Sequence, residues 1–153
     1  MTAAEDEKWM REALVAASEA SAARDVPVGA VVVRGGAVIA RAGNRTVRDQ
    51  DPTAHAELLV IREAARAVGA WRLDDCALFV TLEPCAMCAG ALVLSRISRV
   101  VYGAWDEKAG MAGSVGDILR HPKLNHRPEV AAGVLERECG MMLASFFAAR
   151  RAQ

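Results

Sequence analysis

The chain has 153 residues, of which 53% are hydrophobic, and its nineteen basic side chains balance its nineteen acidic ones. This length predicts one domain, and the apolar share is sufficient for a filled core. No apolar run reaches the ~20 residues of a membrane span, and the acidic N-terminus does not resemble a signal peptide, so we expect a cytoplasmic protein without a membrane segment. Zero net charge does not favour a nucleic-acid partner, although sixteen of the basic residues are arginine, which suits phosphate recognition.

The first half of the chain alternates between helical and strand periodicity. Residues 5–23 carry an apolar stripe at i, i+3 and i+4 spacing, which predicts an amphipathic helix. Residues 28–33 and 37–42 read as two strands joined at Gly35-Gly36, the pattern of a hairpin. After a polar loop, Asp51 is predicted to cap a helix whose first residue is Pro52.

The second half continues this pattern. Gly69 is predicted to end the helix that starts at Pro52. The remaining expected elements are a strand at 76–81, a helix opening at Pro84 and ending near 94, a strand at 98–102, a loop at 103–128 with one helical turn near 117–119, a strand at 129–132 and a helix at 134–151. The order of elements predicts a single three-layer α/β domain, with a mixed central sheet flanked by helices.

Two short motifs supply metal-ligating side chains. His55 is followed two residues later by Glu57, and Cys85 and Cys88 form a C-x-x-C pair after Pro84. One histidine and two thiolates leave the fourth position of a tetrahedral zinc ion open, which is typical of catalytic zinc. Glu57 is close enough to His55 in the chain to move protons of a bound water.

A structural zinc site is the alternative reading, because a lone C-x-x-C is more often redox-active or structural. Such a site needs a fourth ligand, and the remaining cysteines are Cys76 and Cys139. Cys76 begins an apolar strand and Cys139 lies inside the last predicted helix. Both therefore fit better as small buried residues.

The joint pattern H-x-E…P-C-x-x-C is the signature of zinc-dependent nucleobase deaminases. Nearly the whole chain resembles the bacterial tRNA-specific adenosine deaminases. The matching stretches are residues 26–30, 43–45, 51–57, 81–91, 95–97, 112–114 and 146–151. The resemblance implies a cytidine deaminase-like fold, with residues 1–153 as a single deaminase domain.

The resemblance also implies an activity. Members of this family hydrolyse the wobble adenosine of a tRNA anticodon, chiefly that of arginine tRNA, to inosine. One zinc ion (Zn2+) per subunit would be held by His55, Cys85 and Cys88, and the water it activates would attack C6 of adenine. Glu57 would be the catalytic proton carrier. The family is homodimeric, and the apolar residues 86–94 suit burial against a partner subunit.

Four residues match substrate contacts of the family: Asn44, Asp106, Phe147 and Arg150. Asn44 would bond the flipped nucleotide and Asp106 a ribose, while the last two lie in an aromatic and basic C-terminus that would contact RNA. Asp106 is equally consistent with an ordinary turn residue, and Arg150 with an exposed tail. Trp105 departs from the family, whose members commonly carry a basic residue there, and is suited to stack on a base.

A small-molecule deaminase of the same superfamily is the second reading. An enzyme acting on free guanine, cytosine or a nucleoside would share every zinc-binding residue. The loop at 103–128 and the basic, aromatic C-terminus favour the tRNA enzymes instead. A non-catalytic zinc module would require four protein ligands.

Overall fold

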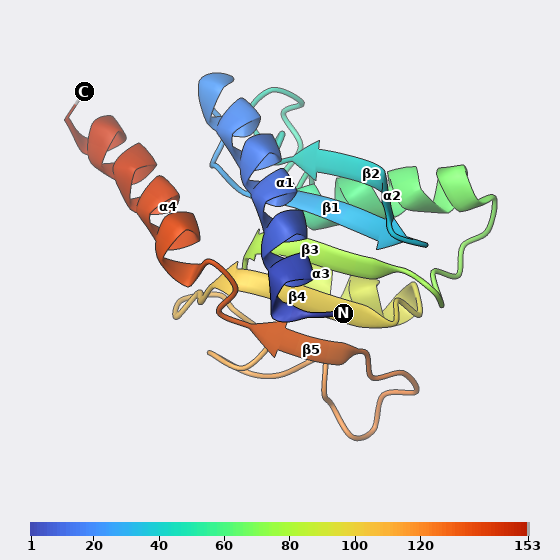
Figure 1. Cartoon of the computed structure of the whole chain (residues 1–153). Coiled ribbons are helices and arrows are strands. Elements are labelled where there is room, and N and C mark those ends of the chain that lie inside the picture. The colour runs from blue at the N-terminus through green and yellow to red at the C-terminus, as the bar shows by residue number, and fades with distance from the viewer. Residues whose placement is uncertain (153) are drawn as a thin grey trace.

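The computed structural model describes residues 1–152, so the last residue of the expected domain lies outside the described part. Helices and strands follow one another in the predicted order (Figure 1). They are α1 (Ala3–Ala22), β1 (Gly29–Arg34), β2 (Ala37–Gly43), α2 (Ala56–Val68), β3 (Ala77–Leu82), α3 (Ala86–Leu94), β4 (Arg99–Ala104), β5 (Glu129–Ala132) and α4 (Glu136–Arg151).

The strands form one five-stranded sheet in the order β2-β1-β3-β4-β5. The β1–β2 hairpin is antiparallel, and β1 also pairs antiparallel with β3. From β3 onward the pairs are parallel, because a crossover helix or a long loop separates each strand from the next. The predicted mixed sheet is confirmed.

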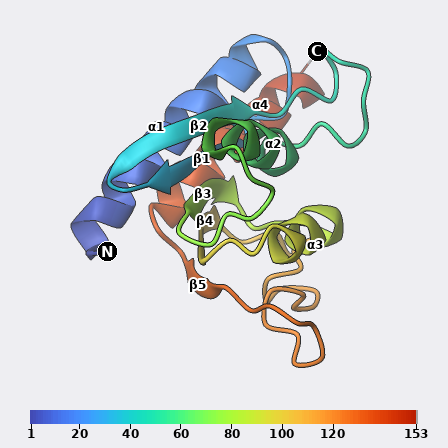
Figure 2. The ribbon, with the colours of Figure 1, turned by 90° about the vertical axis from the view of Figure 1, so that its right-hand side faces the viewer.

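Helices cover both faces of the sheet, which confirms the three layers (Figure 2). Alternate residues of β1 point to opposite faces: Val32 packs in the cluster with α2 and α3, and Val31 packs in the cluster with α1. The predicted apolar stripe of α1 is buried at Trp9, Met10 and Ala13. Along α4 only Cys139 is buried, and the C-terminal end of this helix extends away from the sheet (Figure 1).

The start of α2 was predicted wrongly. Asp51 does not cap a helix; its Oδ1 accepts hydrogen bonds from the Thr53 N–H (2.8 Å) and hydroxyl (2.7 Å). This local Asx turn competes with helix formation, so the helix begins only at Ala56, with His55 as its N-cap. Gly69 ends the helix in the left-handed region, as predicted.

Smaller boundary errors have similar local causes. A capping box between Thr2 and Glu5 starts α1 at Ala3, two residues early. Helix α3 begins at Ala86, after the N-cap Cys85, and not at Pro84 as predicted. The helical turn expected at 117–119 is absent from the described chain, where Asp117 instead forms an isolated bridge.

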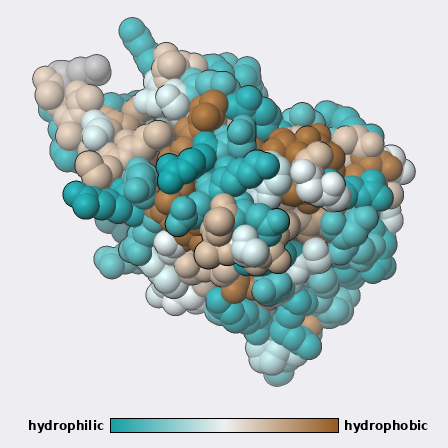
Figure 3. Space-filling model, in the orientation of Figure 1, coloured by the Kyte–Doolittle hydropathy of each residue, from teal (hydrophilic) through white to brown (hydrophobic). Residues whose placement is uncertain are grey.

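Hydrophilic side chains dominate the face shown in Figure 3, where apolar side chains form separate patches. Among residues 1–152, none of the helices has the length and apolar character needed to cross a membrane.

Candidate active site

The site forms at the edge of the sheet where the parallel strands β3 and β4 end. Leu82 and Ala104 are paired in register at these ends. The chain leaving β3 runs through Glu83 and Pro84 to Cys85, and the chain leaving β4 runs into Trp105 and Asp106. Carboxyl ends of parallel strands lie side by side, so both segments reach the same edge of the sheet, the usual ligand-binding place of an open α/β sheet.

His55, Cys85 and Cys88 are brought together as predicted. The Nδ1 atom of His55 lies 3.6 Å from Sγ of Cys85 and 3.5 Å from Sγ of Cys88, and all three donor atoms fall within 4.8 Å of one another. His55 and Cys85 are the N-caps of α2 and α3, and neither side chain caps its own helix. Their side chains face each other instead.

These distances fit a zinc ion. Tetrahedral zinc with bonds of about 2.3 Å to sulfur and about 2.05 Å to nitrogen holds those two atoms about 3.6 Å apart. The cluster contains no fourth His, Cys, Asp or Glu donor among the described residues. Cys76 and Cys139 are both buried outside the cluster, as predicted for these two residues.

Hydrogen bonding within the cluster already favours a thiolate. Hydrogen bonds from Cys88 and His55 lower the pKa of Cys85 far below that of an ordinary thiol. The hydrogen bond between His55 and Cys85 raises the pKa of His55. The hydrogen bond between Cys88 and Cys85, together with burial, raises the pKa of Cys88. Metal ligation requires both cysteines as thiolates and a neutral imidazole, so a bound cation would displace the protons that Cys88 and His55 hold in the metal-free cluster.

Glu57 lies in the first turn of α2 and is 4% exposed. Burial raises the pKa of Glu57 to about 7, against the opposing effect of neighbouring His55. A carboxyl group that titrates near neutral pH is suited both to accept and to donate a proton. Its position beside the metal-ligating cluster agrees with the motif.

Asn44 is held beside the same cluster. Its Oδ1 accepts the N–H of Ala56 (2.8 Å), the first residue of α2, and the side chain is buried. Asn44 thus supplies the capping bond that His55 does not make. The amide nitrogen of Asn44 remains available as a donor to a bound molecule.

Glu83 organises the long loop, a role that sequence reasoning missed. This buried carboxylate accepts the N–H groups of Asp106, Ala112 and Ser114, each at 3.0 Å, and the Ser114 hydroxyl. Burial alone would raise the pKa of Glu83, but these hydrogen bonds outweigh it and lower that pKa. The only signal of this role in the sequence was the place of Glu83, an acidic residue between strand β3 and Cys85.

Asp106 is half-buried at the start of this loop. Its Oδ1 accepts the N–H groups of Lys108 and Ala109, both at 3.1 Å. The bonds are those of an Asx turn, so the turn role of Asp106 is present in the structure. Its second carboxylate oxygen makes no hydrogen bond within the described chain.

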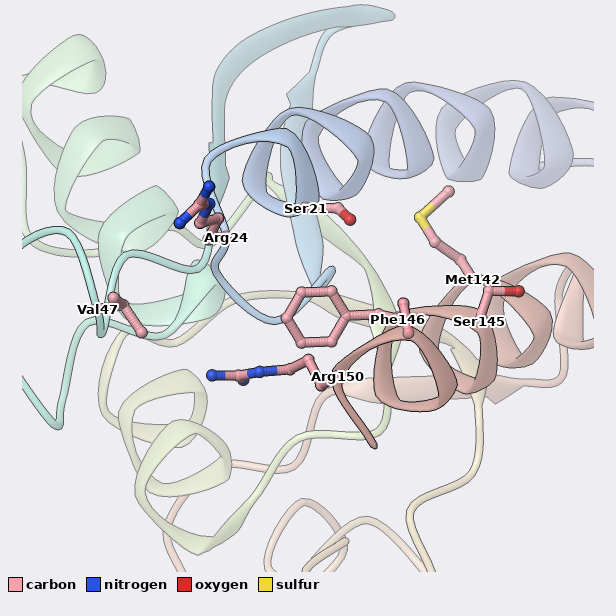
Figure 4. Close-up of a pocket in the computed structure, with 8 residues that line it drawn as sticks. Ser21, Arg24, Val47, Met142, Ser145, Phe146 and Arg150 are labelled. Atoms are coloured by element: carbon pink, nitrogen blue, oxygen red, sulfur yellow. The ribbon is translucent and has the colours of Figure 1, made fainter. Parts of the chain in front are cut away.

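Phe147 and Arg150 lie on α4, separate from the metal-ligating cluster. Phe147 is 41% exposed and contacts Phe146 edge-to-face, with ring centroids 5.4 Å apart. The Arg150 guanidinium lies 5.1 Å from the centre of the Phe146 ring. This ring and Arg150 line a cleft of about 850 Å³ that also includes Arg24 and Val47 (Figure 4).

Val47 connects this cleft with the site. Its N–H donates to Oδ1 of the fully buried Asp25 (2.7 Å), and the guanidinium of Arg48 donates to the other carboxylate oxygen (2.7 Å). Arg48 also bonds the carbonyl of Asn44 (2.9 Å). Asp25 therefore fixes the loop between Asn44 and α2, another long-range contact that the sequence did not reveal.

Comparison with known proteins identifies the family. The model of the MafB19-like deaminases matches residues 4–151. The tRNA-specific adenosine deaminase of Bacillus subtilis is 52% identical over 143 residues, covering 94% of this chain and 89% of that protein. This chain belongs to the tRNA-specific adenosine deaminase family. The enzyme of that name from Agrobacterium fabrum is 47% identical, with 97% of each chain covered.

Solved structures agree with this family assignment. A chain from a study of A-to-I editing by tRNA:A34 deaminases at the wobble position of transfer RNA has a TM-score of 0.86 and 47% identity, covering 89% of this deaminase and 99% of that chain. A guanine deaminase from Bacillus subtilis matches less well, with a TM-score of 0.64 and 35% identity over 95% of this chain and 93% of that one.

Proposed function

We propose that this protein hydrolyses the wobble adenosine, A34, of a tRNA anticodon to inosine. One observation carries the proposal: a three-donor cluster of His55, Cys85 and Cys88 lies beside a buried Glu57 in a chain of this family. Three protein ligands and an adjacent carboxyl group are the parts of a hydrolytic zinc site.

His55, Cys85 and Cys88 would hold one zinc ion per subunit. When bound, zinc supplies Lewis-acid chemistry by lowering the pKa of a water molecule toward neutrality. The protein's part is to hold two thiolates and one imidazole at the start of two helices. Exposed N–H groups and the helix dipoles stabilise negative charge there.

Glu57 would carry protons through the reaction. It takes a proton from the attacking water and delivers it to the adenine ring nitrogen, which allows C6 to become tetrahedral. It then takes the remaining proton from the new C6 hydroxyl and gives it to the amino group, so that the C6–N bond breaks, ammonia leaves and C6 becomes the carbonyl of inosine. Its raised pKa, about 7, supports both directions of transfer at neutral pH.

We assign substrate contacts to Asn44, Asp106, Phe147 and Arg150. Asn44 has a free amide donor beside the cluster, and Asp106 has a free carboxylate oxygen at the same edge of the sheet, suited to a ribose hydroxyl. Phe147 and Arg150 are exposed on α4, where an aromatic ring and a guanidinium suit base stacking and phosphate binding. An anticodon loop offers the unpaired bases that such a site requires.

The proposal includes arginine tRNA as the main substrate, a homodimer and a cytoplasmic location. The outer side of α3 supports a dimer, because its apolar residue Leu94 is 70% exposed. An exposed apolar helix face is a common subunit interface. The cytoplasmic location is proposed because the tRNA substrate is found in the cytoplasm.

The decisive experiment offers two kinds of substrate. Zinc-loaded protein is incubated with an arginine-tRNA anticodon stem-loop and, separately, with free adenosine, cytosine and guanine. We expect inosine from the stem-loop and no product from the free compounds. Guanine deamination without stem-loop activity would instead support the small-molecule reading.

Glu57→Gln is the matched variant for this assay. The amide keeps the shape of the side chain but does not carry the proton, so turnover should fall by roughly 10²- to 10⁴-fold or more. Zinc content, measured by elemental analysis, should stay at one per chain. Turnover near that of the unchanged protein would exclude Glu57 from the mechanism.

A further inference from the structure

A second open groove lies at the edge of the sheet where β4 ends, between the loop that follows β4 and helix α4. It has a volume of about 800 Å³ and is lined by Trp105, Asp106, Gly140 and Met141, among others. Trp105 is 45% exposed and Met141 56% exposed. Gly140 faces open space, since a methyl group placed on it would meet nothing within 4 Å. Two large apolar side chains thus border an unfilled space.

The indole of Trp105 is fixed in place although it is half exposed. Its ring meets Tyr102 edge-to-face, with centroids 5.2 Å apart and planes at 88°. Tyr102 is itself fully buried and donates its hydroxyl to the carbonyl of Ala112 (2.9 Å). Trp105 Cζ3 also lies 3.5 Å from the side-chain position of Gly113. An aromatic ring held in this way loses little entropy when a ligand packs on it.

The groove adjoins the candidate active site. Trp105 follows Ala104, which pairs with Leu82 three residues before Cys85. The next residue, Asp106, donates its N–H to Glu83, two residues before the same ligand. The backbone on both sides of Trp105 is therefore hydrogen-bonded to Glu83, two residues before Cys85. A nucleotide next to the target base would come within reach of this ring.

We propose that Trp105 is a stacking platform for an unpaired nucleobase that flanks the target adenosine in the substrate RNA. The inference rests on the proposed tRNA substrate and adds a subsite to it. Base–aromatic stacking needs an exposed, ordered ring, and Trp105 provides both. Met141, on the opposite wall, supplies a polarisable apolar contact for the same base.

The charges of the groove favour a base over a phosphate as its occupant. Its lining holds three carboxylates, of Asp106, Glu107 and Glu136, and two cations, of Lys108 and Arg137. A net negative lining disfavours a phosphate, whereas a neutral base ring has no such penalty. The phosphates on either side of the base can remain in solvent.

The test is a cycle between protein and RNA variants. Deamination is measured for the unchanged protein, Trp105→Ala and Trp105→Phe, on the intact anticodon stem-loop and on stem-loops with one flanking loop base removed at a time. We expect Trp105→Ala to raise KM by on the order of 5- to 150-fold, with a much smaller change in kcat. Trp105→Phe should recover most of the loss, because it keeps an aromatic face.

One of the abasic RNAs should identify the stacked base. Removing that base should raise the KM of the unchanged protein by a similar factor and leave the KM of Trp105→Ala unaffected. Equal effects of every abasic RNA on both proteins, or an unchanged KM in Trp105→Ala, would overturn the proposal. Zinc content and thermal unfolding of each variant show whether a rise in KM is due to misfolding. If Trp105→Ala is misfolded, the KM of Trp105→Phe decides the outcome.

Tryptophan fluorescence gives an independent readout. Trp9 is buried, and the exposed Trp71 lies at the far end of the fold, after α2, so Trp71→Phe serves as a background that leaves Trp105 as the exposed emitter. Stem-loop binding should quench its emission, and Trp105→Phe in this background should abolish the quenching. Persistent quenching without Trp105 would contradict stacking. If the unchanged protein binds the stem-loop but forms no inosine, the proposed reaction fails while the stacking result still stands.

Discussion

At the scale of single residues, His55 and Cys85 show how the site departs from ordinary helix chemistry. Each occupies an N-cap, where a side-chain oxygen normally satisfies the free N–H groups of the first turn. Here the side chains serve a common cluster, and Asn44 provides the missing bond for α2. The helices therefore aim their N-terminal dipoles at the metal-binding position.

Cys88→Ala tests the ligand set. Removing one of three ligands should abolish most zinc binding and lower the unfolding temperature, because metal affinity contributes to folding. Cys139→Ala, the buried cysteine of α4, is the control and should retain one zinc per chain. Elemental analysis and thermal unfolding measure both effects. Full zinc occupancy in Cys88→Ala would refute the assignment.

The donor residues could be predicted from the sequence because motif spacing and residue type are local information. His55 with Glu57, and Cys85 with Cys88, each form a motif of three or four residues, and the combined deaminase signature joined the two motifs. Glu83 was missed because its partners lie up to 31 residues away, in a loop without periodicity. Asp25 and Arg48 are 23 residues apart and were missed for the same reason.

At the scale of elements, the loop after β4 is held together by its hydrogen bonds to the buried carboxylate of Glu83. Gly110 packs directly against this carboxylate, so a Cβ atom there would collide with Glu83 and with the carbonyl of Asp106. The loop thus has one arrangement, which places Trp105 and Asp106 at the edge of the sheet beside the candidate active site. Loop length alone indicated a functional segment, but its internal order required the structure.

Gly110→Ala should disturb this arrangement. We expect a loss of about 1–3 kcal/mol in unfolding free energy, as for overpacked sites, and a rise in KM for the stem-loop. Gly140→Ala in α4 is the control, because its added methyl meets nothing within 4 Å. That change should stabilise the helix by up to about 1 kcal/mol. Chemical denaturation of both variants measures the difference, and equal stability would contradict the packing argument.

Asp25 makes the fold sensitive to acid through the loop between β2 and α2. Burial would raise the pKa of Asp25, but bonds from Val47 and Arg48 outweigh it and hold the pKa below 3.8. A carboxyl group with a lowered folded pKa stabilises above its unfolded pKa and loses that contribution as pH falls through the folded pKa. The contribution is therefore complete at neutral pH, begins to fall near the unfolded pKa of about 4, and is lost only as the pH falls through the lower folded pKa.

Asp25→Asn should remove this contribution. At pH 7 we expect a loss on the order of 1.5–3 kcal/mol, the range for hydrogen bonds to charged groups. The gap between the variant and the unchanged protein should narrow as pH falls below about 4. Asp49→Asn, which breaks only the exposed pair with Arg45, should cost little at either pH. Thermal unfolding across this pH range checks the prediction, and a gap independent of pH would argue against it.

Sequence patterns predicted the ends of helices less accurately than the helices themselves. Thr2 and Glu5 form a recognisable capping box that was overlooked, whereas Asp51 has the identity of a cap but bonds Thr53 instead. Side-chain oxygen atoms can satisfy either a turn or a helix, and tertiary contacts choose between them. The buried strands were predicted to within one or two residues, because continuous β-branched runs between turns have few alternatives.

At the scale of the whole molecule, one face of α3 is left uncovered by the other residues in the range 1–152. One side of α3 packs on the sheet through Ala89, Leu92 and Val93. Its other side presents Leu94 at 70% exposure, with Gly90 and Ala91 half-buried beside it. Since Cys88 lies in α3 and Cys85 is its N-cap, a subunit packed on this face would also fix the geometry of the proposed metal site.

Leu94→Glu tests this face as the subunit interface. A charge in an apolar contact between two copies is costly unless it finds a partner, so the proposed dimer should dissociate at concentrations where the unchanged protein remains associated. Val15→Glu places the same charge on the exposed side of α1, where Val15 is 48% exposed, and should leave the assembly intact. Sedimentation equilibrium of the three proteins decides the matter. A dimer of undiminished affinity in Leu94→Glu would place the interface elsewhere, and a monomeric unchanged protein would remove the dimer from the proposal.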